Sequence, residues 1–280
     1  MEVIHQFTNR SKDVDLMISK QELKEIARDR NLPLDLVEKD YALGWILIGL
    51  YSSSLANFLI FKGGTALSKV YFPLDWRVSE DLDFTLQQNS NPEDVSKIMV
   101  KELPKSVLKE SNGLKLEFKK APYTTPNFLR VRIQYSGLIT KNNVKIEVTK
   151  EKFIGDYDNI KAFQHYDYPK WSSLTYTLNN ILAEKLRAII ERGHVRDYYD
   201  SWRLLKENKV ELNRTKELFK VKCAAKGVTF NNLSQFFPDD IVERLEPYLS
   251  SGLTRMSPSA LPPLSQIIKE LKFYLTNMLG

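Results

Sequence analysis

The chain has 280 residues, of which 42% are hydrophobic and 27% are charged; this composition argues against fibrous or disordered architectures and favours one large or two modest globular domains. The net charge of +6, from 41 Lys and Arg against 35 Asp and Glu, permits a polyanionic partner without requiring one. The single cysteine excludes an internal disulfide and a thiolate metal cluster. A secretory signal is not recognisable, and no apolar run approaches the roughly 20 residues of a membrane span, so we expect a cytoplasmic protein with no membrane partner.

The basic excess is concentrated in the middle of the chain. Residues 97–161 contain 14 Lys and Arg against 7 Asp and Glu, and residues 184–226 contain 12 against 7. Residues 1–96 are acidic, with 10 Lys and Arg against 15 Asp and Glu. This asymmetry indicates where a polyanion would bind, if one does.

The first third of the chain alternates between helical and strand patterns. The expected elements are a helix opened by a Ser19–Glu22 capping box and running to about Arg30, a helix opened by Asp35 and Glu38, a strand over 58–61, a helical segment over 65–71 and a strand over 82–86.

Further strands and then helices follow. We expect a Lys-studded amphipathic segment from 92 to 109, kinked or broken by Pro104, strands over 114–119, 128–135 and 144–148, and helices from 178 to the end, the last over 264–279. Strands in the first half and helices in the second predict an α+β fold. A mixed β-sheet domain with flanking helices would occupy residues 1–170, and an α-helical domain would occupy residues 171–280.

Two glycines follow the strand over 58–61. Gly63 and Gly64 would leave backbone N–H groups unobstructed at the start of a helix, where phosphate is favoured. A Gly-Gly pair is also common in ordinary turns.

Two carboxylates lie farther along, on the strand over 82–86. Asp81 and Asp83 are two residues apart and so project from the same face, as Mg²⁺ requires of a protein that also presents it with substrate phosphates. Glu147 adds a third carboxylate if its strand lies alongside. The alternative reading is a strand end in solvent, although two charges interleaved with Leu82 and Phe84 are costly to bury without a cation.

A second group of charged residues surrounds a glycine between two predicted helices. Lys185 could hold the charge of a metal-bound triphosphate, and Asp197 could orient that lysine or bind a substrate hydroxyl. On spacing alone, an Arg–Asp helix cap and a solvated lysine explain these residues better.

Taken together, these segments resemble a known family. The order Lys-Gly-Gly-Thr-x-Leu, Arg-x-Ser-x-Asp-Leu-Asp-Phe, Glu-Lys-Leu-Arg-Ala and Arg-Asp-Tyr-Tyr-Asp, over residues 35–205, resembles the AbiEii/AbiGii-type nucleotidyltransferase toxins of the DNA polymerase β-like nucleotidyltransferase superfamily. The resemblance implies a nucleotidyltransferase-type sheet and Mg²⁺- or Mn²⁺-dependent transfer of a nucleoside monophosphate from an NTP to an acceptor hydroxyl. Members act as toxins of toxin–antitoxin or abortive-infection systems, and some relatives extend tRNA 3′ ends.

The same resemblance assigns roles to individual residues. Nucleotide binding falls to Lys62, Gly63, Gly64, Thr65, Ser79 and Lys185. Catalysis falls to Asp81, Asp83, Lys185 and Asp197, and the metal to Asp81 and Asp83. Glu147 is a candidate third metal ligand that no motif aligns.

The basic segment 97–161 is the expected surface for an RNA acceptor. The lysines of the helical pattern, together with Arg130, Arg132, Lys141 and Lys145, could follow a phosphate backbone, and a solvated helix face is the alternative. A cognate antitoxin is a further expected partner. Two other functions stay open at this point: a regulatory module that binds NTP or RNA with a degenerate site, and nucleotidylation of a protein or small molecule.

Overall fold

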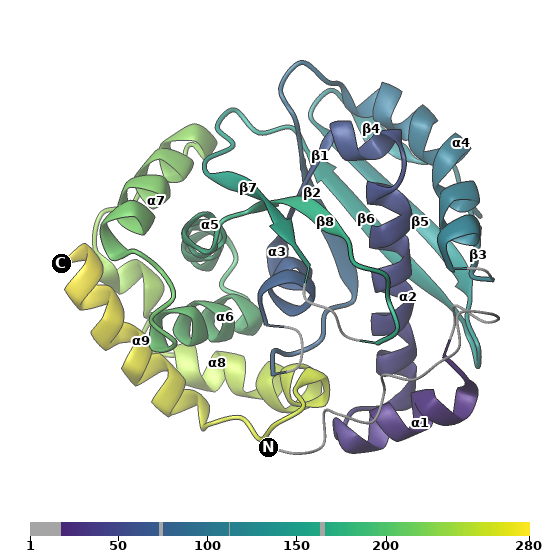
Figure 1. Cartoon of the computed structure of the whole chain (residues 1–280). Coiled ribbons are helices and arrows are strands. Elements are labelled where there is room, and N and C mark those ends of the chain that lie inside the picture. The colour runs from purple at the N-terminus through teal and green to yellow at the C-terminus, as the bar shows by residue number, and fades with distance from the viewer. Residues whose placement is uncertain (1–17, 73–74, 112, 163–165) are drawn as a thin grey trace.

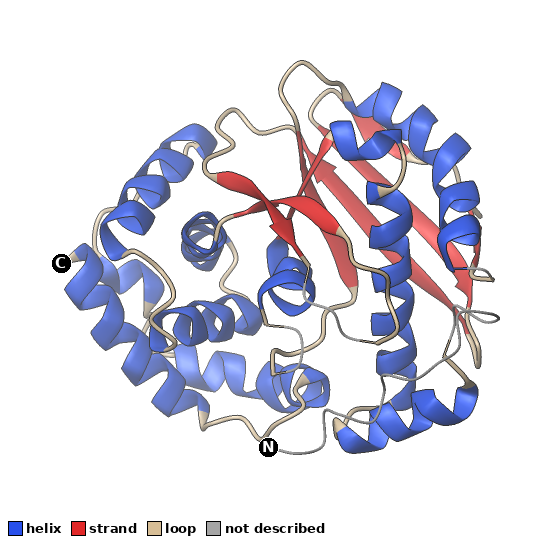
Figure 2. Cartoon of the chain, viewed as in Figure 1, coloured by secondary structure: helices blue, strands red, loops and turns tan. Residues whose placement is uncertain are grey.

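The structure, a computed structural model, describes residues 18–72, 75–111, 113–162 and 166–280. A mixed β-sheet with helices on one side fills one half of the molecule, and helices fill the other half (Figures 1 and 2). The predicted α+β architecture is therefore confirmed. Over the described residues, no helix is long and apolar enough to cross a membrane.

The strands of the described chain form one eight-stranded sheet in the order β3-β5-β6-β2-β1-β8-β7, with β4 paired to β5. Their bounds are β1 Leu59–Lys62, β2 Asp81–Leu86, β3 Lys115–Glu117, β4 Tyr123–Thr125, β5 Phe128–Ser136, β6 Lys141–Thr149, β7 Tyr157–Lys161 and β8 Ser172–Tyr176. The central strand β2 runs antiparallel to β1 and parallel to β6, which places residues from three distant segments side by side.

The α-helices are α1 Lys20–Asp29, α2 Leu34–Tyr51, α3 Gly63–Ala66, α4 Pro92–Ser111, α5 Leu178–Glu191, α6 Val195–Lys206, α7 Leu212–Lys226, α8 Ile241–Tyr248 and α9 Leu264–Leu279. A π-helical turn, Leu67–Tyr71, continues α3, and a second one, η4 (Leu249–Leu253), continues α8. The apolar side chains of β2, β5 and β6 are fully buried beneath α2 and α4, and the alternate side chains of these strands are polar except for the half-buried Phe128. The sheet thus has one covered face and one open polar face.

Both predicted helices are found close to their expected starts, but Glu38 does not act at the start of the second one. Ser19 Oγ accepts from Glu22 N at 3.2 Å and Glu22 Oε2 accepts from Ser19 N at 2.7 Å, which is the predicted capping box of α1. The start of α2 follows Pro33 without a side-chain cap. Glu38 is instead buried and accepts hydrogen bonds from Ile139 N at 2.6 Å and Thr140 N at 3.1 Å. The Glu38 carboxylate thus makes a tertiary contact with the β5–β6 turn.

The end of the sheet lies beyond the boundary expected at residue 170. The strand β8 follows that boundary, yet it pairs with β1 and β7. A division of the chain at the point where the sheet ends therefore falls at Thr177, and α5 is the first element after it.

The basic residues expected on one surface occupy two. Lys97, Lys101, Lys105 and Lys109 are exposed on α4, which covers one face of the sheet and runs unbroken past Pro104. Arg130 and Arg132 alternate with the buried residues of β5 and so lie on the open face. A phosphate backbone following the open face would therefore contact the sheet arginines and not the lysines of α4.

Candidate active site

Three acidic residues meet on the open face of the sheet. Asp81 and Asp83 lie two residues apart on β2, and the parallel β2–β6 register places Glu147 directly beside Asp83. On the other side of Asp83, the antiparallel β1–β2 register places Lys62. The structure thus brings together the three carboxylates that the sequence could only suggest were neighbours.

Basic side chains accompany two of these carboxylates. Lys145 Nζ lies 3.2 Å from Asp81 Oδ2 and 3.4 Å from Glu147 Oε2. Arg130 Nε donates to Glu147 Oε1 at 2.7 Å. In the described part of the chain, no side chain forms an ion pair or hydrogen bond with the Asp83 carboxylate. Burial, reinforced by the charges of Glu147 and Asp81, raises the pKa of Asp83 above its ordinary value although Lys62 opposes the shift.

The donor set at this point fits a divalent cation. Asp83 is a carboxylate that has no counter-ion and lies beside a second carboxylate. Hard oxygen ligands of this kind suit Mg²⁺ when phosphates and water complete its coordination shell. Among the described residues, no three Asp, Glu, His or Cys side chains converge as a metal site. Glu147 is held by both Arg130 and Lys145, and Asp81 by Lys145 alone, so Asp83 fits a metal most directly and Asp81 is its nearest companion on the strand.

The two glycines after β1 are needed for close approaches by charged side chains. Gly63 has a φ of +79°, and a Cβ atom there would lie 2.7 Å from Asp83 Oδ2. A Cβ atom on Gly64 would lie 2.7 Å from Arg77 Nη2. Both positions line the cavity described below, so the backbone of the glycine motif is exposed to it.

The residues predicted on the helices form a buried ionic network. Lys185 Nζ, on α5, lies 2.9 Å from Asp197 Oδ1 and 3.0 Å from Asp200 Oδ2, both on α6. Asp200 also accepts Nε and Nη2 of Arg77 at 2.9 and 2.6 Å, and Asp197 accepts Arg192 Nε at 3.0 Å. The reading of Lys185 as a solvated lysine is therefore wrong, and its predicted pairing with Asp197 is confirmed.

This network fixes the charge state of its members. Burial alone would lower the pKa of Lys185, but Asp197 and Asp200 outweigh it and hold the pKa above the usual value. Burial would likewise raise the pKa of Asp197, and Lys185 and Arg192 outweigh it, so that this pKa is depressed. The lysine is thus a permanent cation held in one orientation.

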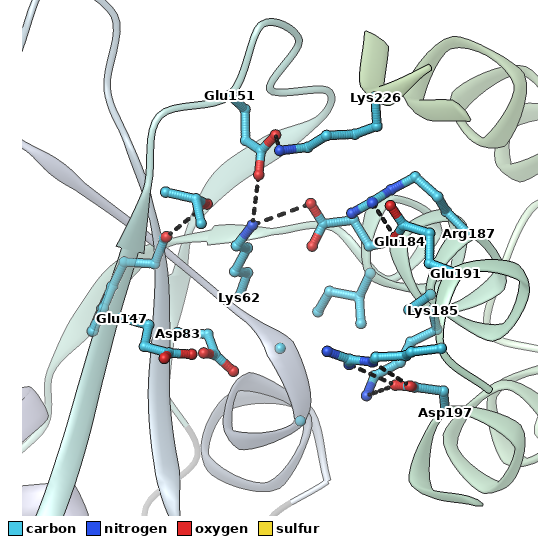
Figure 3. Close-up of a pocket in the computed structure, with 17 residues that line it drawn as sticks. Lys62, Asp83, Glu147, Glu151, Glu184, Lys185, Arg187, Glu191, Asp197 and Lys226 are labelled. Atoms are coloured by element: carbon cyan, nitrogen blue, oxygen red, sulfur yellow. Dashed lines mark hydrogen bonds and ion pairs between the residues drawn. The ribbon is translucent and has the colours of Figure 1, made fainter. Parts of the chain in front are cut away.

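The sheet carboxylates and the helix network face each other across a cavity of about 350 Å³. Figure 3 shows Asp83 and Glu147 on one side and Lys185 and Asp197 on the other. Carboxylates that can hold a metal lie on one wall and a lysine lies on the opposite wall. This arrangement suits a ligand whose phosphates contact both the metal and the lysine.

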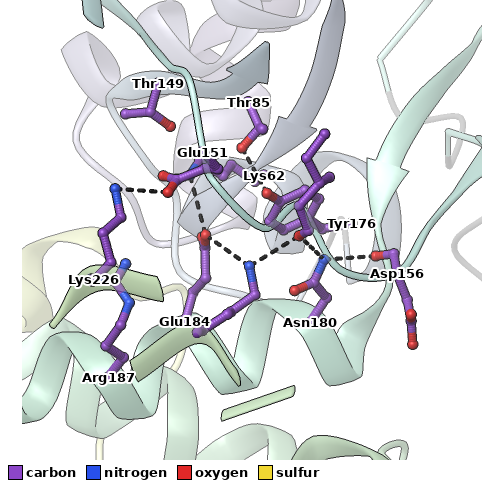
Figure 4. A network of polar contacts seen from close by, with 12 residues as sticks. Lys62, Thr85, Thr149, Glu151, Asp156, Tyr176, Asn180, Glu184, Arg187 and Lys226 are labelled. Carbon is purple, nitrogen blue, oxygen red and sulfur yellow. Dashed lines mark hydrogen bonds and ion pairs between the residues drawn. The ribbon is translucent and has the colours of Figure 1, made fainter. Parts of the chain in front are cut away.

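A second buried network closes one end of the cavity. Lys62 Nζ lies 3.2 Å from Glu184 Oε1 and 3.4 Å from Glu151 Oε1, and Lys226 Nζ lies 2.7 Å from Glu151 Oε2 (Figure 4). Lys222 reaches Glu184 at 3.2 Å. Burial opposes the charged form of Lys62, but Glu184 and Glu151 outweigh it and raise its pKa. Lys62 is thus a buried cation that pairs with two protein carboxylates, as Lys185 does.

The predicted site residues do not all line this cavity. Those that do are Lys62, Gly63, Gly64, Asp83, Glu147, Lys185 and Asp197. Thr65 is buried and its hydroxyl donates to the Asp81 carbonyl, which ties α3 to β2. Asp81 and Ser79 lie next to the cavity; Ser79 Oγ would be 3.5 Å from a Cβ atom on Gly64.

Sequence reasoning missed Arg77, Asp200 and Glu184 as parts of the site. A signal for Asp200 was present, because it follows Asp197 by three residues on a helix and so shares its face. Arg77 opens the second motif, but nothing local shows that its partner lies 123 residues away.

The family model for the nucleotidyl transferase AbiEii toxin of type IV toxin–antitoxin systems matches residues 45–267. This chain belongs to that family. The match extends past residue 205, where the motif resemblance ended, so the helices α7 and α8 and the start of α9 are part of the family fold. The predictions of the family, of a nucleotidyltransferase and of a toxin of a toxin–antitoxin system are thereby confirmed.

A solved structure agrees with this fold. The nucleotidyltransferase toxin MenT4 from Mycobacterium tuberculosis H37Rv is 16% identical, with a TM-score of 0.64, and the alignment covers 91% of this chain and 89% of that one. The protein JHP933 from Helicobacter pylori is 19% identical, with a TM-score of 0.49 over 88% of this chain and 93% of that one. The sequence has no significant match among curated proteins.

Proposed function

We propose that this AbiEii-family protein transfers a nucleoside monophosphate from an NTP to a hydroxyl group of an RNA acceptor, such as a tRNA 3′ end, in the presence of Mg²⁺ or Mn²⁺. The observation that carries the proposal is the placement of Asp83, without a counter-ion, across the cavity from the buried cation Lys185. In this reaction the acceptor oxygen bonds to the α-phosphorus and its proton passes to water. The bond from the α-phosphorus to the bridging oxygen breaks, and pyrophosphate leaves.

The residues of the chain have separate tasks in this proposal. Lys185, held by Asp197 and Asp200, neutralises phosphate charge, and the backbone at Gly63 and Gly64 lies against the triphosphate. Asp81 and Asp83 would hold the metal, which supplies Lewis-acid stabilisation of charge on the phosphates. Lys145 pairs with Asp81 and would move toward solvent or toward substrate phosphate when that carboxylate binds a cation.

The open face of the sheet supports RNA as the acceptor. Arg130 and Arg132 of β5 and Lys145 of β6 lie on the same face as Asp81 and Asp83. Tyr123, opposite Arg130 on β4, has 59% of its surface exposed and is available to stack on a base. A basic surface that begins at the catalytic strand suits a nucleic acid whose end must reach that strand.

The biological role follows from the family. We propose that the activity arrests growth in the cytoplasm, where it serves abortive phage defence, and that a cognate antitoxin encoded beside it relieves the arrest. Co-expression with the neighbouring gene should restore growth, and a neighbour that leaves the arrest unchanged would contradict this part of the proposal.

The decisive experiment uses Asp83→Asn. The wild-type protein is incubated with each labelled NTP, Mg²⁺ and total RNA, and the labelled macromolecule is identified. We expect label on RNA, and loss of on the order of 10²–10³-fold in rate for Asp83→Asn, because removing one charge-stabilising group has effects of this size. The melting temperature of the variant should not fall, since a half-buried carboxylate without a counter-ion is replaced by a neutral group.

Glu117→Gln is the matched control, because Glu117 is an exposed carboxylate of the same sheet on β3, paired with Lys119. It should keep full activity. Label on a protein or a small molecule would identify a different acceptor, and NTP binding without any transfer would indicate a binding module. Full transfer by Asp83→Asn would refute the mechanism.

A further inference from the structure

A second cavity of about 550 Å³ lies between the start of α6 and the segment formed by α8 and η4. It shares Arg192 with the active-site cavity and reaches Glu80, the residue before Asp81. The two cavities therefore meet at Arg192, at the end of α5, and the second one extends to the start of β2. A ligand in the second cavity lies next to the catalytic strand without occupying the place of the triphosphate.

The walls of this cavity carry cations that the protein leaves without partners. Arg196 and Arg244 are exposed, and among the described residues no carboxylate pairs with either of them. Arg192 is held by Asp197, and the one acidic residue in the lining, Glu80, is paired with Lys39 at 3.1 Å. Two free guanidinium groups at a cavity are suited to bidentate contacts with phosphate.

The remaining lining is apolar and aromatic. Leu245 and Leu253 are buried at the floor, and Tyr248 has 62% of its surface exposed. A Cβ atom on Gly252 would meet nothing within 4 Å, so this side of the cavity is open. An exposed phenol ring beside an apolar floor suits the face of a nucleobase, and the cavity has the size of an ordinary ligand pocket.

We propose that this second cavity binds the 3′-terminal nucleotide of the RNA acceptor, with its phosphate on Arg196 and Arg244 and its base against Tyr248. The proposal rests on the proposed function, of which it names the acceptor subsite. Asp81 is on the open sheet face and next to this cavity, because Glu80, which precedes it, lines the cavity and Lys145 of the open face pairs with it. An RNA strand that passes over Asp81 therefore places its last nucleotide in the cavity and its preceding nucleotides against the arginines of the sheet.

The test is the double variant Arg196→Ala/Arg244→Ala. Its affinity for a fluorescein-labelled single-stranded RNA of twelve nucleotides with a free 3′ hydroxyl is measured by anisotropy without NTP. We expect the Kd to rise at least tenfold and the KM for RNA to rise in parallel, with kcat and the Kd for a non-hydrolysable NTP unchanged. Tyr248→Ala should raise the same Kd severalfold without changing the salt dependence of binding.

The matched control is Lys269→Ala/Lys272→Ala, which removes two exposed charges from α9, outside both cavities. It should bind RNA as the wild type does. Equal affinity of the two double variants would overturn the proposal, as would a loss of NTP binding in Arg196→Ala/Arg244→Ala or a wild-type protein that does not bind the RNA. A wild-type protein that binds this RNA but transfers no nucleotide to it refutes the proposed function instead. In that case the ratio of the Kd of Arg196→Ala/Arg244→Ala to the wild-type Kd still decides whether the cavity binds RNA.

Discussion

The substitution Gly63→Ala tests how closely the backbone must approach the catalytic carboxylate. The new Cβ atom would lie 2.7 Å from Asp83 Oδ2 and 3.1 Å from Asp83 Cβ. Ordinary van der Waals contact begins at 3.4 Å, so the carboxylate must move by about 0.7 Å. Since the neighbouring Cβ atom is also too close, rotation of the Asp83 side chain alone does not relieve the overlap.

Two effects of different size follow from this geometry. The φ of +79° at residue 63 is left-handed, which costs an alanine roughly 1–2 kcal/mol of stability. Misplacement of a catalytic group by about 1 Å costs on the order of 10²-fold in rate, so we expect kcat/KM for nucleotide transfer to fall by about that factor. The loss of activity should therefore be far larger than the loss of folded protein.

A second glycine separates the two effects. Gly227, at the end of α7, has a φ of +68° and nothing within 4 Å of its Cβ position. Gly227→Ala should lose a similar 1–2 kcal/mol in urea unfolding and keep wild-type transfer activity. Equal activity of the two variants would refute the assigned contact between the glycine backbone and Asp83.

Two further predictions concern the buried ionic networks. Asp200→Asn should lower the free energy of unfolding by about 3–5 kcal/mol, because Arg77 is left buried without its partner. The double variant Arg77→Met/Asp200→Leu removes both charges and should recover most of that loss. A loss below about 1 kcal/mol for Asp200→Asn in urea unfolding would contradict this prediction. Burial would raise the pKa of Glu184, but Lys62 and Lys222 outweigh it and lower this pKa from 4.5 to about 2. The ionised carboxylate therefore stabilises the fold by about 3 kcal/mol above pH 4.5, and this contribution is lost as the pH falls toward 2. The stability gap between wild type and Glu184→Gln should narrow over that range, and a gap that stays constant from pH 7 to pH 2.5 would be inconsistent with the depressed pKa.

Local sequence was sufficient for most elements and for the motif residues. The strand over Leu82–Leu86, the capping box at Ser19 and the last helix each have a pattern that is recognisable within a few residues, and all three are found. The short strands β4, β7 and β8 were not predicted, because their largely polar sequences become strands only by pairing with neighbours in the sheet.

The sequence by itself determined that Asp81 and Asp83 share a face and that glycines follow β1, because strand alternation and backbone freedom are local properties. Only the tertiary structure decided that Glu147 lies beside Asp83, since the parallel β2–β6 register joins segments 64 residues apart. It also decided that Arg77 meets Asp200, and that the lysines of α4 and the arginines of β5 lie on different sides. Contacts of this kind depend on how distant segments pack together, and a short stretch of sequence does not carry that information.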